Sequence, residues 1–229
     1  MTILAVDVTS EFGSLAIQAE GEKIAEMALH SQDGFAHVIF GAIQDLLAMA
    51  KLRLDDIDCF ASASGPGAFT GVRVGLSAVK GLAQAMNKPA AGVSNLRALA
   101  VFGSSGARAV VMDARRGEVF GAVYDHRLEA VAPEAVLKFE VWLGSLQVEP
   151  CEFIVPAGSP FCSALKDTRF AQARCREAPR NLAPAIAWCA KLDGRAGRWC
   201  DAAALDANYV RRSDAELLFG VARKSSINK

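Results

Sequence analysis

The feature that most constrains this chain is a short element that occurs in both halves of the sequence. In each copy an apolar strand ends in an aspartate, a glycine-containing turn follows, and a second strand returns. The first copy runs from Val6-Asp7 to Gly13, and the second from Met112-Asp113 to Gly117. Apolar runs bounded by turn residues predict strands, so each copy predicts a β-hairpin. We therefore expect two related lobes, one built around each hairpin.

Strands and helices alternate after the first hairpin. Apolar residues at steps of three and four predict helices over 35–51, 70–86 and 96–102, whereas short apolar runs predict strands over 23–29, 59–64 and 90–94. The order β-β-β-α-β-α-β-α is that of a ribonuclease-H-like lobe, a mixed sheet with helices on its faces. The pattern restarts after Gly103-Ser104-Ser105-Gly106, where later segments predict helices over 164–173 and 183–191.

These patterns predict an α/β fold with two ribonuclease-H-like lobes. We expect the first lobe over 1–103, a second and more degenerate lobe over 107–220, and a disordered tail over 221–229. Two such lobes in sequence are similar to the plan of the actin/Hsp70/sugar-kinase (ASKHA) superfamily. That resemblance implies a nucleotide cleft between the lobes, with phosphates held by the two hairpin turns.

Two helices of the first lobe carry apolar or small residues on more than one face. A helix with two such faces is expected to be covered on two sides, by its own sheet and by a partner. On the second of these helices the small residues recur at steps of four and three, which lets another helix approach closely. The residues expected at the partner interface are Phe35, Val38, Ile39, Ala42 and Met49 on the first helix, and Gly71, Gly75, Ala78, Leu82 and Ala85 on the second.

The glycine-rich run Gly65–Gly75 follows a predicted strand and opens a predicted helix, which is the position of a phosphate-binding loop. No Gly-Lys-Ser/Thr closes it, which excludes a Walker A loop. The third glycine of a dinucleotide-binding fingerprint would fall on Thr70, and no acid follows to hold a ribose. The remaining prediction is a tight turn before a helix N-terminus, which serves close packing or contacts an anion. The side chains expected nearest a phosphate are Asp7, Thr9, Ser10 and Arg115, and none is predicted to be catalytic.

Metal binding is not predicted. The position four residues after His37 is Gly41, so no His-x-x-x-His pair exists on that helix. The six cysteines include no Cys-x-x-Cys pair and match no common zinc spacing, so we expect reduced thiols. The N-terminus lacks the basic segment of a signal peptide, and no apolar run is long enough for a membrane span. A cytoplasmic protein is expected.

Charge is unevenly distributed along a chain that is neutral overall. Residues 59–112 contain five bases and no acid, whereas residues 1–58 contain ten acids and three bases. The acid-free stretch favours an anionic partner, unless its helices are simply mostly buried. Direct contact with tRNA therefore stays open as an additional role, for which the basic candidates are Arg73, Lys80, Arg115, Arg116, Arg211 and Arg212.

Four segments together resemble the TsaB (YeaZ) family. They are the glycine-rich run Gly65–Gly75, the opening Val6–Ser10, the second hairpin Asp113–Phe120, and the stretch Tyr209–Glu216 near the C-terminus. The resemblance spans nearly the whole chain in order and is weakest over 126–200. One departure is Ala207, where the family usually has a proline, which affects only a local turn.

The resemblance implies a non-catalytic subunit that pairs with its homologue TsaD in making N6-threonylcarbamoyladenosine on tRNA, next to the anticodon. TsaD would hold the metal and transfer the group, and the small ATPase TsaE would join the pair. In the family the partner contact is made by the two first-lobe helices described above. We expect no intrinsic cofactor, ATP or ADP only in the complex with TsaD and TsaE, and a homodimer when the chain is alone. The alternatives are an active ATPase or kinase of the same superfamily, or a metallopeptidase.

Overall fold

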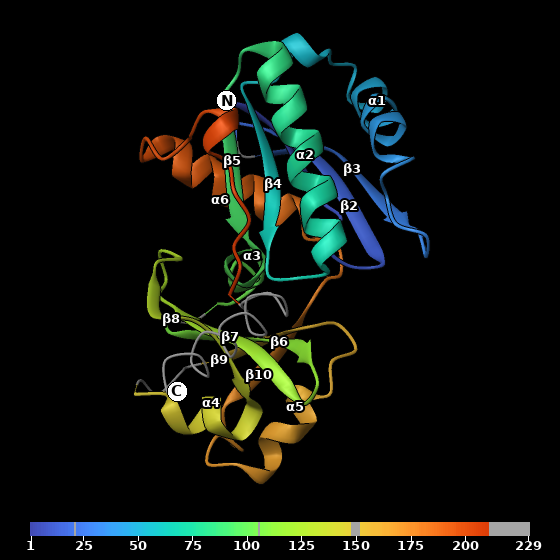
Figure 1. Ribbon diagram of the computed structural model, residues 1–229. Helices are drawn as coiled ribbons and strands as arrows, with labels where there is room; N and C mark the ends of the chain where they lie inside the picture. The colour runs from blue at the N-terminus through green and yellow to red at the C-terminus, as the bar shows by residue number, and fades with distance from the viewer. Residues whose placement is uncertain (21, 105, 148–151, 211–229) are drawn as a thin grey trace, which may run out of the picture.

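The computed structural model describes residues 1–20, 22–104, 106–147 and 152–210 (Figure 1). Its strands form two five-stranded sheets, with helices on their outer faces and between them. The fold is α/β, and its two lobes each contain a mixed sheet with helices on its faces, as the sequence predicts. Among the described residues, no helix has the length and apolar character needed to cross a membrane.

The first sheet has the order β3-β2-β1-β4-β5, in which β1 pairs antiparallel with β2 and parallel with β4. The strands and helices of this part of the chain are β1 Thr2–Asp7, β2 Phe12–Ala19, β3 Glu22–His30, α1 Ile39–Ala50, β4 Cys59–Gly65, α2 Phe69–Met86, β5 Ala90–Ser94 and α3 Asn95–Ala100, with a 3-10 turn at Leu54–Asp56. Strands β1 and β4 are almost wholly buried, since helices cover both faces of the sheet, and this explains their nearly continuous apolar sequences.

The second sheet repeats the plan of the first. Its order is β10-β9-β6-β7-β8, and its central strand β6 again pairs antiparallel with one neighbour, β7, and parallel with the other, β9. Its elements are β6 Arg108–Arg115, β7 Glu118–Tyr124, β8 Ala130–Lys138, α4 Phe139–Ser145, β9 Glu152–Pro156, α5 Phe161–Ala164 and β10 Arg174–Ala178, with 3-10 turns at Leu165–Asp167 and Ala202–Ala204. The repeated hairpin of the sequence therefore occupies the same place in both sheets.

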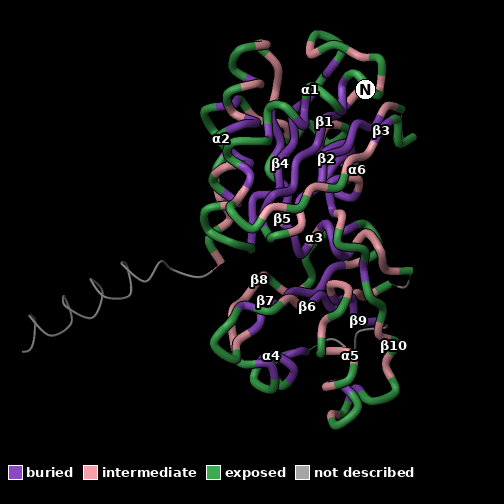
Figure 2. Tube along the Cα trace, turned by 90° about the vertical axis from the view of Figure 1, so that its right-hand side faces the viewer, coloured by how far each residue is buried: buried purple, intermediate pink, exposed green. Residues whose placement is uncertain are grey.

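Buried residues form layers around the two sheets (Figure 2). Helices α1 and α2 cover the outer face of the first sheet, and α4 covers the outer face of the second. Helix α3 and helix α6 (Ala183–Arg195) lie between the sheets, where they pack on residues such as Ile3 of β1 and Ile154 of β9. The two lobes thus share one middle core.

Helix α6 packs on the lobe that it does not follow in the sequence. It lies against β1 and β2 of the first sheet, and the backbone N–H of Ala183 donates to Ser14 Oγ at 3.0 Å. The predicted domain limits, 1–103 and 107–220, remain predictions, but α6 falls within the second range and packs on the first sheet. The predicted disordered tail, 221–229, lies outside the described residues.

The helix predicted over 164–173 is wrong. Helix α5 ends at Ala164, a 3-10 turn follows, and β10 begins at Arg174. The cause is local: Thr168 Oγ1 donates to the carbonyl of Leu165 at 2.7 Å and accepts from Phe170 N at 3.1 Å. Such side-chain bonds to the neighbouring backbone compete with helical hydrogen bonds and end the helix.

The expectation of reduced thiols is wrong for two cysteines of the second lobe. Cys162 of α5 and Cys175 of β10 form a disulfide, with their Cα atoms 5.5 Å apart. The fold brings α5 beside β10, which the spacing of cysteines along the chain does not reveal. Cys59, Cys189 and Cys200 are free thiols, and Cys151 lies outside the described residues.

Candidate functional site

The first hairpin turn holds the acid that ends the first strand. Asp7 lies at the end of β1, with 3% of its surface exposed. Its Oδ1 accepts two hydrogen bonds from Thr9, from the backbone N–H at 3.0 Å and from Oγ1 at 2.7 Å. Burial raises the pKa of the Asp7 carboxyl, and the hydrogen bonds from Thr9 oppose that effect. The Asp7 carboxyl is therefore hydrogen-bonded within its own turn.

The same network reaches the glycine-rich turn. Asn95, the first residue of α3, donates from Nδ2 to Thr9 Oγ1 at 2.8 Å and accepts at Oδ1 from the N–H of Gly65 at 3.1 Å. Ala68 N donates in turn to the carbonyl of Thr9 at 2.7 Å. These contacts hold the hairpin turn, α3 and the N-terminus of α2 together.

The second hairpin turn has the same local hydrogen bond in an open setting. Asp113 Oδ1 accepts from the backbone N–H of Arg115 at 2.8 Å, as Asp7 does from Thr9. Arg115 and Arg116 both have positive φ, 65° and 57°, so they form the tight corner of the turn. The Arg115 side chain is 87% exposed and lies 3.7 Å from the Asp113 carboxylate.

A cleft of about 900 Å³ lies between the two turns. Three of the four residues predicted near a phosphate, Thr9, Ser10 and Arg115, line it together, whereas Asp7 is not among its lining residues. The remaining lining residues supply further polar groups and an apolar wall: Glu11, Phe12, Gly65, Pro66, Gly67, Ala68, Phe69, Val72, Met112, Asp113, Ala114, Arg116, Phe120, Asn208, Tyr209 and Val210.

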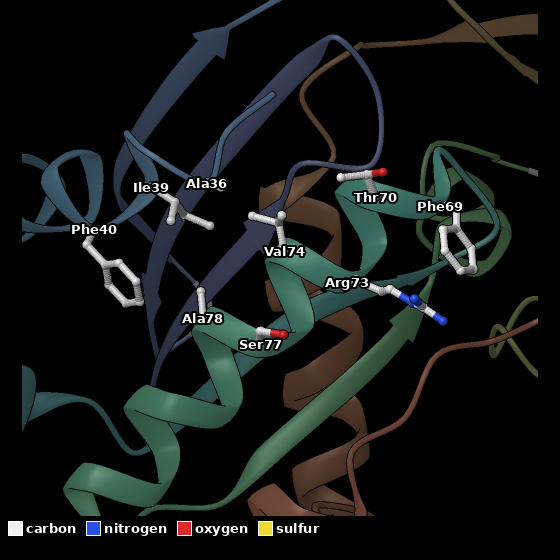
Figure 3. Close-up of a pocket in the computed structure, with 9 residues that line it drawn as sticks. All are labelled: Ala36, Ile39, Phe40, Phe69, Thr70, Arg73, Val74, Ser77 and Ala78. Atoms are coloured by element: carbon white, nitrogen blue, oxygen red, sulfur yellow. The ribbon is translucent and has the colours of Figure 1, made fainter. Parts of the chain in front are cut away.

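A second hollow, which we call the outer groove, lies between α1 and α2 on the surface of the first lobe (Figure 3). Its volume is about 460 Å³, and its lining is mostly apolar: Ala36, Ile39, Phe40, Phe69, Thr70, Arg73, Val74, Ser77 and Ala78. Figure 3 shows Val74 and Ala78 on the side of α2 that faces α1, with Phe69 and Arg73 on the other side. Phe40 and Phe69 are large apolar side chains that remain about half exposed at its rim.

Four of the eight non-glycine residues predicted at the partner interface belong to the chain's own core. The exposed fraction is below 9% for Phe35, Ile39, Ala42 and Ala78. Ile39 and Ala78 nevertheless also line the outer groove. Phe35 precedes α1 rather than opening it, and its ring packs against Gly13. Val38, Met49 and Ala85 are exposed and Leu82 is partly exposed, so they remain available to a partner.

The expectation for Gly71 and Gly75 is corrected, because both glycines face the chain's own sheet. A Cβ on Gly71 would lie 2.1 Å from the carbonyl oxygen of Val8, and a Cβ on Gly75 would lie 3.0 Å from Ser62 Oγ. These glycines let α2 approach β1 and β4 closely. The spacing along the helix shows that one face of α2 carries small residues, but it does not show which neighbouring element packs against that face.

Two other helix glycines fit an interface better. Gly41 of α1 and Gly81 of α2 are exposed, and a Cβ added at either would meet no atom within 4 Å. Glycine inside a helix costs roughly 0.5–1 kcal/mol relative to alanine, and no contact within the described residues accounts for that cost here. Phe40, Ser77 and Gly81 also lie on this exposed face, although they were not predicted at an interface. A helical wheel that places Gly75 in the core puts Ser77 and Gly81 on the exposed side.

Tyr209, which belongs to the stretch near the C-terminus that resembles the family, packs against α2. Its ring lies 6.1 Å from that of Phe69, and its hydroxyl accepts from Arg73 Nε at 3.3 Å. The Arg73 guanidinium stacks 3.8 Å over the Phe69 ring. Of the other basic candidates for tRNA contact, Arg115 and Arg116 are at the cleft, Lys80 lies farther along α2, and Arg211 and Arg212 are outside the described residues.

No three His, Cys, Asp or Glu side chains within the described part of the chain come together in a way that would hold a metal ion.

The chain is similar to known proteins in sequence and in structure. The family model described as TsaD, tRNA N6-adenosine threonylcarbamoyltransferase, matches residues 29–173. The tRNA threonylcarbamoyladenosine biosynthesis protein TsaB of Bacillus subtilis is 32% identical over 152 residues, which cover 64% of this chain and 66% of that protein. The matched stretch therefore spans slightly less than two thirds of the length of this curated relative.

Solved structures match over a longer part of the chain. A Pseudomonas aeruginosa protein described as similar to peptidase YeaZ has a TM-score of 0.77 and 26% identity, covering 92% of this chain and 99% of that one. The ethanolamine utilization protein EutJ of Carboxydothermus hydrogenoformans has a TM-score of 0.52 at 12% identity, covering 82% and 89% of the two chains, and shows the fold alone.

Proposed function

Because this chain belongs to the family of TsaD, tRNA N6-adenosine threonylcarbamoyltransferase, and within it to the TsaB (YeaZ) proteins, we propose that it takes part in making threonylcarbamoyladenosine on tRNA. Its role there is that of a non-catalytic subunit, which binds and supports TsaD while the adenosine next to the anticodon is modified in the cytoplasm. TsaE joins the pair, and tRNA is reached through the complex.

The outer groove carries this proposal. An apolar hollow between two helices, with half-exposed Phe40 and Phe69 at its rim, is the kind of surface that another protein covers. Exposed Gly41 and Gly81 give a partner helix room to approach the backbones of α1 and α2. A homologous subunit has helices of the same kind to offer, and in its absence a second copy of this chain uses the same surface as an isologous dimer.

The state of Asp7 supports a non-catalytic role. An acid that works on a metal-bound phosphate must present its carboxylate to the cleft. Here the carboxylate is buried, and its Oδ1 already accepts two hydrogen bonds from Thr9. The same observation disfavours the alternatives of an active ATPase or kinase.

We place any nucleotide in the interlobe cleft, and only within the assembly with TsaD and TsaE. The support is the meeting of Thr9, Ser10 and Arg115 at one cleft of about 900 Å³. Titration calorimetry with ADP checks this: the isolated chain should give no measurable heat, whereas the assembled complex should bind. Binding by the isolated chain would make the nucleotide an intrinsic ligand.

The decisive experiment mixes the chain with TsaD and TsaE from the same organism and measures complex formation by ultracentrifugation and modified adenosine in tRNA by mass spectrometry. Phe40→Asp is compared with Val141→Asp, because these side chains are matched in exposure, 53% and 54%, but lie on different lobes. Losing an interface anchor costs about 2 kcal/mol or more, which weakens binding roughly thirtyfold. Phe40→Asp should bind TsaD poorly and lose tRNA modification, and Val141→Asp should do neither.

Two results would overturn the proposal. Equal TsaD binding by both variants would move the interface away from the outer groove. ATP hydrolysis by the purified chain, abolished by Asp7→Ala, would make the subunit an enzyme.

A further inference from the structure

A short helix and an edge strand of the second lobe are joined by the disulfide between Cys162 and Cys175. Helix α5 has four residues, and none of them is fully buried. Strand β10 lies at the end of its sheet beside β9, and of its five residues only Ala178 is fully buried. Little apolar surface therefore holds the two elements in place, and the covalent bond supplies much of their connection.

The cysteines of this pair differ from the other described cysteines in reactivity. Cys162 and Cys175 are both partly exposed, whereas Cys59 and Cys189 are buried. Burial raises the pKa of the thiols of Cys59, Cys189 and Cys200, that of Cys189 to about 12. Thiol–disulfide exchange needs a thiolate and access to a sulfur atom. The described cysteines thus offer one disulfide that an external thiol can reach and three thiols that ionise little at neutral pH.

The chain that follows β10 contacts the first lobe directly. The guanidinium of Arg180 lies 4.3 Å from the centre of the Phe12 ring, and Asn181 Nδ2 donates to Glu26 Oε1 at 3.2 Å. Phe12 begins β2 and lines the interlobe cleft. Since only Pro179 separates Arg180 from β10, a movement of β10 is passed on to the wall of the cleft.

Strand β10 has other contacts that do not involve the disulfide. Arg176 Nε lies 3.1 Å from Glu152 Oε1, and Arg176 Nη2 donates to Ser104 Oγ at 3.3 Å. The strand is also paired with β9 along its whole length. Loss of the covalent bond is therefore expected to loosen α5 and β10 without unfolding the lobe, which is what a reversible switch requires.

We propose that the Cys162–Cys175 disulfide is a redox switch, whose reduction by a dithiol releases Arg180 from Phe12 at the wall of the interlobe cleft. One thiolate of the dithiol attacks a sulfur of the disulfide, and the S–S bond breaks as a mixed disulfide forms. The released cysteine sulfur leaves as a thiolate and takes up a proton. The second thiol of the reductant then displaces the other cysteine, so that two electrons pass to the cysteine pair and the dithiol becomes a disulfide.

This inference goes beyond the proposed function. The cytoplasm proposed for this protein supplies thiol reductants, and disulfides in that compartment are typically transient or redox-sensing. Only the source of the reductant is taken from that proposal. The test uses the isolated chain, so its outcome is independent of whether the chain binds TsaD.

A redox titration tests whether the disulfide is reducible in the folded protein. The full chain is equilibrated in mixtures of reduced and oxidised dithiothreitol, its free thiols are alkylated, and mass spectrometry measures the state of Cys162 and Cys175. Reduction should be complete and reversible while near-ultraviolet circular dichroism shows a folded chain. A disulfide that is reduced only after denaturant unfolds the chain would be a structural link and would overturn the proposal.

Limited digestion with trypsin measures the release of Arg180, because trypsin cleaves after arginine. In the reduced and alkylated chain, cleavage between Arg180 and Asn181 should be faster by about tenfold or more, since proteolysis follows the population of the open state. Cleavage after Arg53, whose side chain is 84% exposed in the first lobe, is the reference and should not change. Equal cleavage after Arg180 in the oxidised and reduced chains would contradict the switch.

Variants separate the contact from the disulfide. In the oxidised chain, Phe12→Ala should expose Arg180 to trypsin without reduction, whereas Phe40→Ala, a change at an exposed phenylalanine of α1, should not. The double variant Cys162→Ser, Cys175→Ser should be cleaved after Arg180 at the rate of the reduced chain in every redox buffer. A double variant as resistant as the oxidised chain would show that the disulfide does not hold Arg180 in place.

Discussion

The two hairpin turns that line the interlobe cleft are the same local structure in two environments. In each, an aspartate accepts the backbone N–H two residues further on, at 3.0 Å for Asp7 and 2.8 Å for Asp113. Asp7 is buried, and its turn is bonded onward through Thr9 to Asn95, whereas the Asp113 side chain is 53% exposed beside Arg115. The buried turn connects parts of the first lobe to one another, whereas the exposed turn lines the interlobe cleft.

The contrast extends to the lobes as a whole. The first lobe is held by close packing of a long helix, α2, on its sheet, and the outer side of that helix is exposed. The second lobe has shorter helices, α4 and α5, and a disulfide between α5 and β10. One lobe depends on packing and the other also on a covalent link.

The largest effect is expected where the first lobe is packed most tightly. Gly75→Leu forces a side chain against Val8 and Ser62, and overpacking of this kind costs about 3 kcal/mol or more. Gly81→Leu on the open side of the same helix should instead stabilise the chain by roughly 0.5–1 kcal/mol. Urea unfolding of both variants measures the difference. Similar stability for the two would contradict the assignment of inner and outer faces.

The second lobe should respond to loss of its disulfide. Cys162 and Cys175 are separated by 13 positions, and closing a loop of that size stabilises a protein by about 3 kcal/mol at most. The double variant Cys162→Ser, Cys175→Ser should therefore lower stability by up to that amount. Hydrogen exchange should increase in β9 and β10 and stay unchanged in β1. Faster exchange in the first lobe would show that the two lobes unfold as one.

The hairpin turns should differ in their sensitivity to substitution. Thr9→Val removes the hydroxyl that donates to Asp7 and accepts from Asn95, and leaving buried groups unpaired costs about 2 kcal/mol. Asp113→Ala removes an exposed hydrogen bond and should cost less than about 0.5 kcal/mol. Thermal unfolding of the two variants checks this, and equal losses would mean that burial is not what distinguishes the turns.

The smallest expected effect is a dependence on pH. Burial raises the pKa of Asp7 above its ordinary value of 3.8, so folding favours the protonated carboxyl. The stability contributed by this group is present below that ordinary pKa and is lost as the pH rises through the raised value. Asp7→Asn keeps the shape without a charge. Its free energy of unfolding, relative to the unsubstituted chain, should therefore increase between pH 4 and pH 7, and a decrease would contradict the direction of the shift.

Much of the fold was predictable, because the spacing of apolar residues and of turn residues along the chain indicates hairpins and helices. The repeated Asp-turn-Gly element gave the two lobes, and the predicted α2 differs from the observed one by a single residue at its start. The faces of that helix were not predictable, since Gly75 and Gly81 look alike in sequence and differ only in what lies opposite. The contact of Arg73 with Tyr209 joins residues 136 positions apart, and no periodic pattern carries such information.

The return of α6 to the first sheet sets an order of events during synthesis on the ribosome. Strands β1 and β2 are made first, but the helix that covers their inner face is made only at residues 183–195. At about 5–20 residues per second, the interval is on the order of 10–40 s. During that time Ile3 and Ala5 have no cover on that face, and the second lobe emerges in the meantime. A chain released before α6 is made therefore carries a first sheet whose inner face is uncovered, although α1 and α2 are already present on its outer face.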